Sequence, residues 1–228
     1  RLLAFCLQQG FFPSVPARKL LMHAEVTNAL TNALHAICLL VYFLASWRAK
    51  WSGCSSYSRL VVGFFFLTFV LKVMGVFVHY RPDSQAAGVV WVVVGAGVVV
   101  LHYLIMAAVG LPGRLRVVGL LFCAGTGALA LALRGFDLVS IQILGINLAA
   151  ALWCRGLLRI GFLGVALSNV CWLVVRRGAE AWIGGELPTA YRYDNDLYHF
   201  MLIASTFIIY KAFARGEEGG CPLQGGRA

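Results

Sequence analysis

Long apolar runs dominate the chain, and short groups of polar residues, glycine and proline separate them. A helix needs about 20 mostly apolar residues to cross the hydrocarbon core of a bilayer. Breaks such as Arg81-Pro82-Asp83 and Leu111-Pro112-Gly113 divide the runs into segments suited to such helices. The pattern predicts an all-α fold, that of a polytopic membrane protein whose seven transmembrane helices form a bundle at residues 21–46, 59–80, 87–109, 115–134, 137–154, 157–175 and 197–214.

The limits of these segments predict the domain organisation. Residues 1–215 form one seven-helix transmembrane domain, in which the longest connection covers residues 176–196. Residues 216–228 are rich in glycine and contain Pro222, which is typical of a disordered C-terminal tail. Because the chain begins at Arg1 rather than Met, we expect its natural N-terminus to lie upstream. The first 20 residues show no signal-peptide pattern.

The composition argues against a soluble domain. Hydrophobic residues make up 61% of the chain and charged residues 12%, whereas a soluble domain carries about 25% charged residues. So few charges cannot cover a water-facing surface, and we therefore expect membrane lipid to be the main partner. The net charge of +10 comes from Lys and Arg residues that lie mainly at the ends of apolar runs, where lipid phosphates attract them. This placement explains the charge without nucleic acid, and we predict that the chain binds none.

Seven crossings would place the N-terminus and the connections at 81–86, 135–136 and 176–196 on one side of the membrane, which we call the N-side. Of the Lys and Arg residues at helix ends and in connections, the opposite side carries 10 and the N-side carries 8. Cytoplasmic connections carry the excess of Lys and Arg, so this difference favours a cytoplasmic C-terminus. Seven of the nine Asp and Glu residues fall on the N-side. Acids do not set topology, so a functional site at that end is one explanation.

The first segment carries polar residues at helical spacing. Glu25, Asn28, Asn32 and His35 follow one another at intervals of three, four and three residues, which places them on one stripe of a helix. Polar groups inside a membrane are costly, so this stripe is expected to face the interior of the bundle. It either supports a functional site or joins helices by hydrogen bonds, as Asn side chains often do in membranes.

The second segment ends with His79 at the N-side, level with Glu25. Lys72 lies on the same face, two turns or about 10 Å deeper in the membrane. A buried Lys needs a partner, and Glu25 or an Asn of the first segment is the expected one. A structural ion pair and a catalytic role explain Lys72 equally well.

The last segment opens with Asp194-Asn195-Asp196, followed by His199. Asp196 and His199 are three residues apart and share a helix face, so they could bind a metal together, or the carboxylate could orient the imidazole. Capping of the helix N-terminus explains the three polar residues equally well, but it does not explain His199.

Topology brings these residues to one level of the membrane, because the first and last segments begin at the N-side and the second ends there. Two histidines and a carboxylate can hold zinc with an open position for water, whose pKa falls to about 7. We predict His79, His199 and Asp196 as ligands of a zinc cofactor, and Glu25 and Asp196 as catalytic residues. The predicted supporting residues are Asn28, Asn32, His35, Lys72 and Asn195. His102, Asn147, Ser168 and Asn169 are interpreted as structural hydrogen-bonding residues.

The run Ala24-Glu25-x-x-Asn28-x-x-Thr31-Asn32 resembles the first-helix motif of the alkaline ceramidases, A-E-x-x-N-x-x-[ST]-N. His79 and His199 fall where that family, and the related progestin and adipoQ receptors, place zinc-binding histidines. The chain also resembles a group of uncharacterised membrane proteins that share these features. The resemblance implies a seven-helix membrane fold and a zinc-dependent hydrolase, with the first-helix Glu supporting the site.

The chain also departs from that family. The hydrolases carry H-x-x-x-H on the last helix, where this chain has Asn195 and His199, and a Ser where this chain has Gly75. Two hypotheses follow. In the first, the protein is a metal-dependent hydrolase of a lipid amide or ester. In the second, it is a non-catalytic membrane protein, receptor-like or structural, whose polar cluster is a metal or hydrogen-bond staple.

Overall fold

The computed structural model describes residues 17–51, 59–80, 85–133, 136–184 and 194–216. All regular structure in these ranges is α-helix, and no strand occurs in them. The helices are α2 (Ala17–Trp51), α3 (Arg59–Tyr80), α4 (Gln85–Ala108), α5 (Gly113–Leu133), α6 (Phe136–Trp153), α7 (Gly156–Ile183) and α8 (Asp194–Ala214).

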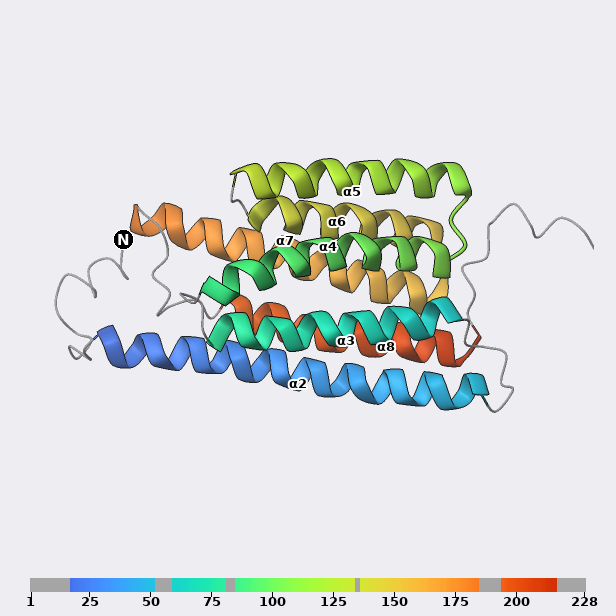
Figure 1. Cartoon of the computed structure of the whole chain (residues 1–228), viewed down its shortest axis with the longest axis horizontal. Coiled ribbons are helices and arrows are strands. Elements are labelled where there is room, and N and C mark those ends of the chain that lie inside the picture. The colour runs from blue at the N-terminus through green and yellow to red at the C-terminus, as the bar shows by residue number, and fades with distance from the viewer. Residues whose placement is uncertain (1–16, 52–58, 81–84, 134–135, 185–193, 217–228) are drawn as a thin grey trace, which may run out of the picture.

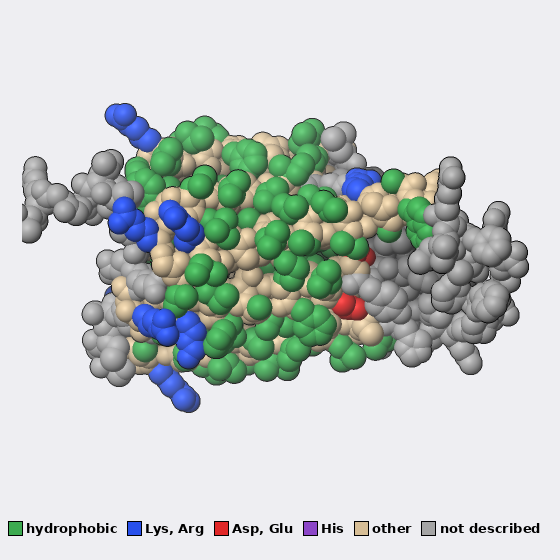
Figure 2. Space-filling view, turned by 180° about the vertical axis from the view of Figure 1, so that it is seen from behind, with side chains coloured by type: hydrophobic (Ala, Val, Ile, Leu, Met, Phe, Trp, Pro, Cys, Tyr) green, Lys and Arg blue, Asp and Glu red, His purple; other side chains and the backbone are tan. Residues whose placement is uncertain are grey.

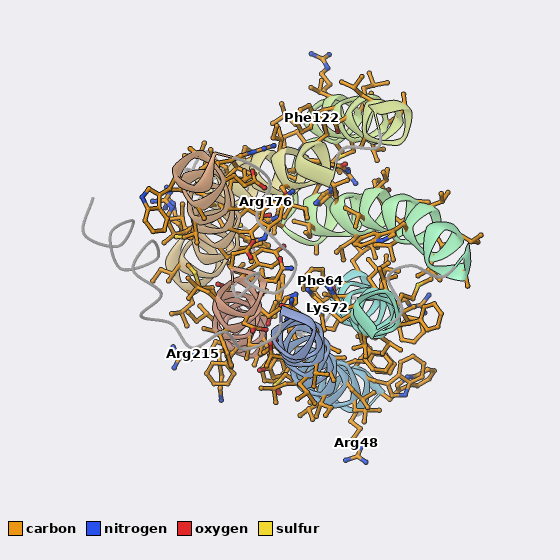
Figure 3. All side chains as sticks on the ribbon, turned by 90° about the vertical axis from the view of Figure 1, so that its left-hand side faces the viewer. Arg48, Phe64, Lys72, Phe122, Arg176 and Arg215 are labelled. Atoms are coloured by element: carbon orange, nitrogen blue, oxygen red, sulfur yellow. The ribbon has the colours of Figure 1, made fainter. Side chains whose placement is uncertain are left out.

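The helices run side by side along the long axis of the molecule (Figure 1). Consecutive helices pack against each other from α2 to α6 and from α6 through α7 to α8, and α8 also packs against α2. The first and last described helices therefore close the bundle into a ring. Helix α5 packs against α4 and α6 at the edge farthest from α2, so it lies outside the ring (Figures 1 and 3). The predicted all-α bundle is confirmed.

The observed helices follow the predicted segments closely, with one correction. The prediction that residues 176–196 form a connection is wrong for residues 176–183, because α7 continues to Ile183. Two arginines in this stretch bind one carboxylate: Arg176 Nε and Arg177 Nη1 donate to Glu180 at 3.0 and 2.9 Å. Pairs three and four residues apart stabilise a helix, so these charges extend α7 rather than end it. Gly184 ends it, in the left-handed conformation with φ of 72°.

Six of the helices are long and apolar enough to cross a membrane: α2, α3, α4, α5, α7 and α8. Helix α6 has a shorter apolar stretch, Leu138–Trp153. Large apolar side chains cover the outer surface, among them Leu30, Leu121 and Leu152, which are 62–72% exposed (Figure 2). Such a surface is stable against acyl chains and not against water. The chain is therefore a multi-pass helical membrane protein, and a seventh crossing by α6 stays a prediction.

Small residues let two helices approach each other closely. A side chain added at Gly161 of α7 would place its Cβ 3.1 Å from the backbone nitrogen of Ile209 in α8, closer than real contacts allow without a shift. Gly164 meets Ser205 of α8 in the same way. Membrane helices pack through such residues because lipid gives them no hydrophobic drive to associate. The position of α8 within the bundle is fixed largely by this contact with α7.

The interior divides into an apolar half and a polar half. Toward the C-terminal end of α8, Tyr42 stacks on Tyr210 with ring centres 4.7 Å apart, and Phe65 packs against both rings. Toward the N-side, α2 and α8 bring buried polar side chains together, including Asn28, Thr31, Asn32, His35, Asp194, His199 and Thr206. The polar half is where the predicted site lies.

Candidate functional site

Thr31 of α2 is the centre of the polar cluster. Its Oγ1 lies 2.9 Å from Oδ1 of Asp196 and 2.9 Å from Nδ1 of His199, both on α8. It also lies 3.2 Å from the carbonyl oxygen of Asn28, one turn earlier in α2. Thr31 and His199 are both buried. One hydroxyl group therefore joins the predicted carboxylate to the predicted imidazole.

The direction of these hydrogen bonds fixes the tautomer of His199. Thr31 is the donor to Oδ1 of Asp196 and to the Asn28 carbonyl, and its single hydroxyl proton goes to one of them. The Thr31 oxygen must then accept from His199, whose Nδ1 carries the proton. Nε2 is left as the basic nitrogen of the ring. A carboxylate that orients a histidine in this way is the arrangement found behind metal-binding and proton-accepting imidazoles, here with a hydroxyl inserted.

His79 of α3 stands next to His199. The ring centres lie 6.0 Å apart with the planes at 76°. Two imidazoles that share one zinc at Zn–N distances of about 2.0–2.1 Å hold their ring centres roughly 5 Å apart, so a shift of about 1 Å would let both bind one ion. The structure thus brings the two predicted histidines side by side, and the zinc between them stays a prediction.

A third protein ligand is not part of this arrangement. Among the side chains that the structure describes, no group of three or more His, Cys, Asp and Glu is gathered closely enough to hold a metal ion. Asp196 reaches His199 through Thr31, which suits an orienting role better than direct coordination. Glu25 lies in α2, but its side chain is outside the described part of the chain. A zinc site here would therefore have two imidazoles as protein ligands and one carboxylate that contacts a ligand through Thr31.

His35 of α2 also faces α8, one turn deeper in the membrane than Thr31. His35 Nε2 lies 3.2 Å from Oγ1 of Thr206, and that hydroxyl donates to the carbonyl of Leu202 at 2.8 Å. Thr206 therefore accepts from His35, whose proton is on Nε2. No described group lies within hydrogen-bonding distance of His35 Nδ1, although this atom is buried. His35 thus joins α2 to α8, as the hydrogen-bonding interpretation of the stripe expects.

Lys72 lies on the inner side of α3 (Figure 3). Its Nζ is 5.6 Å from the centre of the Tyr198 ring. No described carboxylate forms an ion pair with it. The predicted partner Glu25 lies outside the described side chains, so the ion pair stays a prediction. Lys72 is placed inside the polar cluster, close to the paired histidines.

The remaining supporting residues differ in their surroundings. Asn32 is buried against Gly75 of α3, where an added Cβ would lie 3.6 Å from Asn32 Oδ1. Asn195 accepts a hydrogen bond of 2.7 Å from Trp172 Nε1 and so joins α8 to α7. Asn28 is buried beside Thr31 and offers its carbonyl to it. Asn195 is thus engaged in a contact between helices.

A separate polar cluster lies among α4, α5 and α6. His102 Nδ1 is 3.1 Å from Nε2 of Gln142 and 3.5 Å from Sγ of Cys123, and all three residues are buried. These contacts join three helices, as expected of a structural histidine. Asn147, Ser168 and Asn169 donate to carbonyl groups of their own helices.

Sequence reasoning gave Thr31 no role, although it lies on the polar stripe of α2. Asn28, Thr31 and His35 follow one another at intervals of three and four residues, the same spacing that identified the stripe. Thr206 could have been found similarly, since it lies seven residues after His199 and shares its helix face. A threonine on a membrane helix is weak evidence for a site, because threonine is common there.

No protein-family model, curated protein or solved structure matches this chain.

Proposed function

We propose that this chain is a metal-dependent hydrolase that cleaves the amide or ester bond of a membrane lipid. The observation that supports the proposal most is the hydrogen-bond chain from Asp196 through Thr31 to Nδ1 of His199. It leaves Nε2 of His199 deprotonated next to the ring of His79. Such a pair of imidazoles serves as metal ligands when one ring is oriented by a carboxylate.

The residues divide into four roles in this proposal. His79 and His199 hold the metal, and Asp196 orients His199 through Thr31. Zinc, when bound, polarises a carbonyl group and lowers the pKa of a water molecule to about 7. Glu25 supports the site or accepts the proton of the attacking water. Lys72 supplies positive charge where the tetrahedral oxyanion of acyl transfer forms, because preorganised charge in a water-poor site stabilises it strongly.

The surroundings of the site favour a lipid substrate. A groove of about 490 Å³ lies between α2 and α3, and apolar side chains line it from Ala33 and Phe77 to Leu40 and Phe69. The end of the groove nearer the N-side is level with Asn32 and His79, since Ala33 and Phe77 are their near neighbours in sequence. An acyl chain in the groove would bring a bond near its head to the level of the histidines.

The topology that accompanies this function is a bundle of seven crossings, with α6 as the short one. Lys and Arg gather at the end of the bundle that holds the C-terminus of α8, whereas acidic side chains appear at the other end (Figure 2). We infer that the basic end is cytoplasmic, by the excess of Lys and Arg on that side. The site would then open to the lumenal or extracytoplasmic half of the membrane.

The alternative is a non-catalytic membrane protein in which the same contacts join helices. Two observations favour it: no described third ligand stands beside the histidines, and Gly75 brings no hydroxyl to the site. In that case Thr31 would act as a staple between α2 and α8. The two proposals differ in whether metal is bound and in whether lipid is cleaved.

Metal analysis of the purified protein, together with a fluorescent lipid amide or ester, separates them. The hydrolase proposal expects about one equivalent of zinc, lost together with lipid turnover in His79→Ala and His199→Ala. His102→Gln is a matched control, because His102 is an equally buried histidine outside the site. Protein without zinc and without turnover would refute the hydrolase proposal. Zinc without lipid turnover would support the alternative, in which the metal joins helices and no lipid is cleaved.

A further inference from the structure

A groove opens on the outer surface between the beginning of α7 and the end of α8. It encloses about 420 Å³ and lies at the basic end of the bundle. Four apolar and two cationic side chains line it. The lining residues are Leu157, Phe207, Ile208, Lys211, Ala214 and Arg215.

The two cations of the groove have no described counter-ion. Lys211 and Arg215 are four residues apart on one face of α8, and both are exposed. Neither forms an ion pair within the described ranges, whereas Arg176 and Arg177 at the opposite end share Glu180. The nearest acids in sequence, Glu217 and Glu218, follow outside those ranges. Two positive charges without a carboxylate partner among the described residues attract an anion.

The geometry holds these charges at the groove. Lys211 Nζ lies 5.4 Å from the centre of the Phe207 ring, a cation–π distance that turns the ammonium back along the helix. Arg215 projects outward from the end of α8 (Figure 3). Arg159, the neighbouring cation of α7, donates to the carbonyls of Ala151 and Cys154 and so closes the turn between α6 and α7. Lys211 and Arg215 are therefore the two cations that line the groove.

Stabilisation of the helix C-terminus accounts for part of this pattern, because cations there interact favourably with the helix dipole. It does not account for the apolar trough beneath them. Phe207 is 44% exposed and lies one turn below Lys211, at a depth where acyl chains begin. A ligand that satisfies both parts carries a phosphate at its head and a hydrocarbon chain below.

We propose that this groove binds one anionic phospholipid, with its phosphate on Lys211 and Arg215 and an acyl chain along Phe207, Ile208 and Leu157. A zwitterionic lipid carries a compensating amine and would bind less tightly. This site is independent of the histidine cluster, which lies toward the other end of the bundle. The protein would therefore keep it whether or not it cleaves lipid.

The test uses the full chain, reconstituted in vesicles of phosphatidylcholine with about one fifth phosphatidylglycerol and then extracted in mild detergent. The measurement is the amount of each lipid retained per protein. We expect about one phosphatidylglycerol, and a loss of roughly 30-fold in its affinity in the double variant Lys211→Ala with Arg215→Ala, since each cation near a membrane surface contributes about fivefold. The variant Lys211→Arg with Arg215→Lys keeps both charges and should keep the lipid.

The matched control removes Arg48 and Lys50, two cations at the same end of the bundle on α2 that do not line the groove. Equal loss of lipid in this control would overturn the proposal, because it would show diffuse attraction and no site. Stabilisation by inorganic phosphate to the same degree as by the lipid would also overturn it in favour of a free anion. Thermal unfolding of each variant identifies misfolding. If alanine misfolds, Lys211→Gln with Arg215→Gln repeats the test.

Discussion

Replacing Thr31 with Val removes one hydroxyl group from the middle of the polar cluster and changes its shape very little. The hydroxyl has two side-chain partners at 2.9 Å, the carboxylate of Asp196 and the imidazole of His199. Valine keeps the volume of the side chain, so the effect reports on the hydrogen bonds and not on packing. Both partners stay behind, and His199 is almost completely buried.

The expected loss follows from these two partners. A buried polar group left without a partner costs about 1–3 kcal/mol, and more when it is charged. Taking about 2 kcal/mol for the buried His199 and about 1 kcal/mol for the half-buried Asp196, we expect Thr31→Val to destabilise the bundle by about 3 kcal/mol. For a chain of this size that corresponds to a fall in Tm of about 6–12 °C. Thr31→Ser keeps the hydroxyl and loses one methyl group, worth about 1 kcal/mol or 2–4 °C.

The assay is thermal unfolding of the purified protein in one detergent, with both variants measured beside the parent chain. Metal content is measured on the same samples. If Asp196 orients His199 through Thr31, Thr31→Val should also weaken metal binding by about 10–100-fold, the usual effect of losing a group that orients a ligand. Equal Tm values for the Val and Ser variants would refute the reasoning, since the hydroxyl would then contribute nothing.

Three further predictions concern the rest of the bundle. Gly161→Leu should destabilise the bundle by about 1–3 kcal/mol or more and so lower Tm, because the added Cβ meets the backbone of Ile209. Gly125→Leu is the control and should leave Tm unchanged, because no atom lies within 4 Å of its added Cβ. Gln142→Leu should destabilise the bundle by about 1–3 kcal/mol in thermal unfolding, because it removes a buried partner of His102; an unchanged Tm would contradict the role of this cluster. Glu180→Gln should speed hydrogen exchange in residues 176–183, and less so at high salt, because both arginines of α7 lose their carboxylate.

Most of the fold could be predicted because the length of an apolar run is a direct consequence of bilayer thickness. The breaks at residues 81–84 and 109–112 fall where proline, glycine and charge interrupt those runs. The end of α7 could not be found in this way, because Arg176 and Arg177 look like a connection until their pairing with Glu180 is known. An isolated Arg on a sequence is typical of a helix end, whereas an Arg with a Glu three or four residues later is compatible with a continuing helix.

The site was only partly predictable for a similar reason. Spacing within a helix predicted the stripe of α2 and the shared face of Asp196 and His199. The meeting of His79 with His199 followed from topology, and the rings indeed lie 6.0 Å apart. The bridging role of Thr31 depends on distances between helices that are 165 residues apart in the chain, and periodicity carries no information about them. The close approach of α7 to α8 through Gly161 is unpredictable for the same reason.

The contact between α2 and α8 has a consequence for how the protein is made. Synthesis proceeds from the N-terminus, so α2 and α3 enter the bilayer long before α8 leaves the ribosome. During that interval His35 has no contact with Thr206 of α8, its later partner, and water or an assisting membrane chaperone must satisfy it. Nascent chains halted before residue 194 should therefore be recognised as unfinished and degraded.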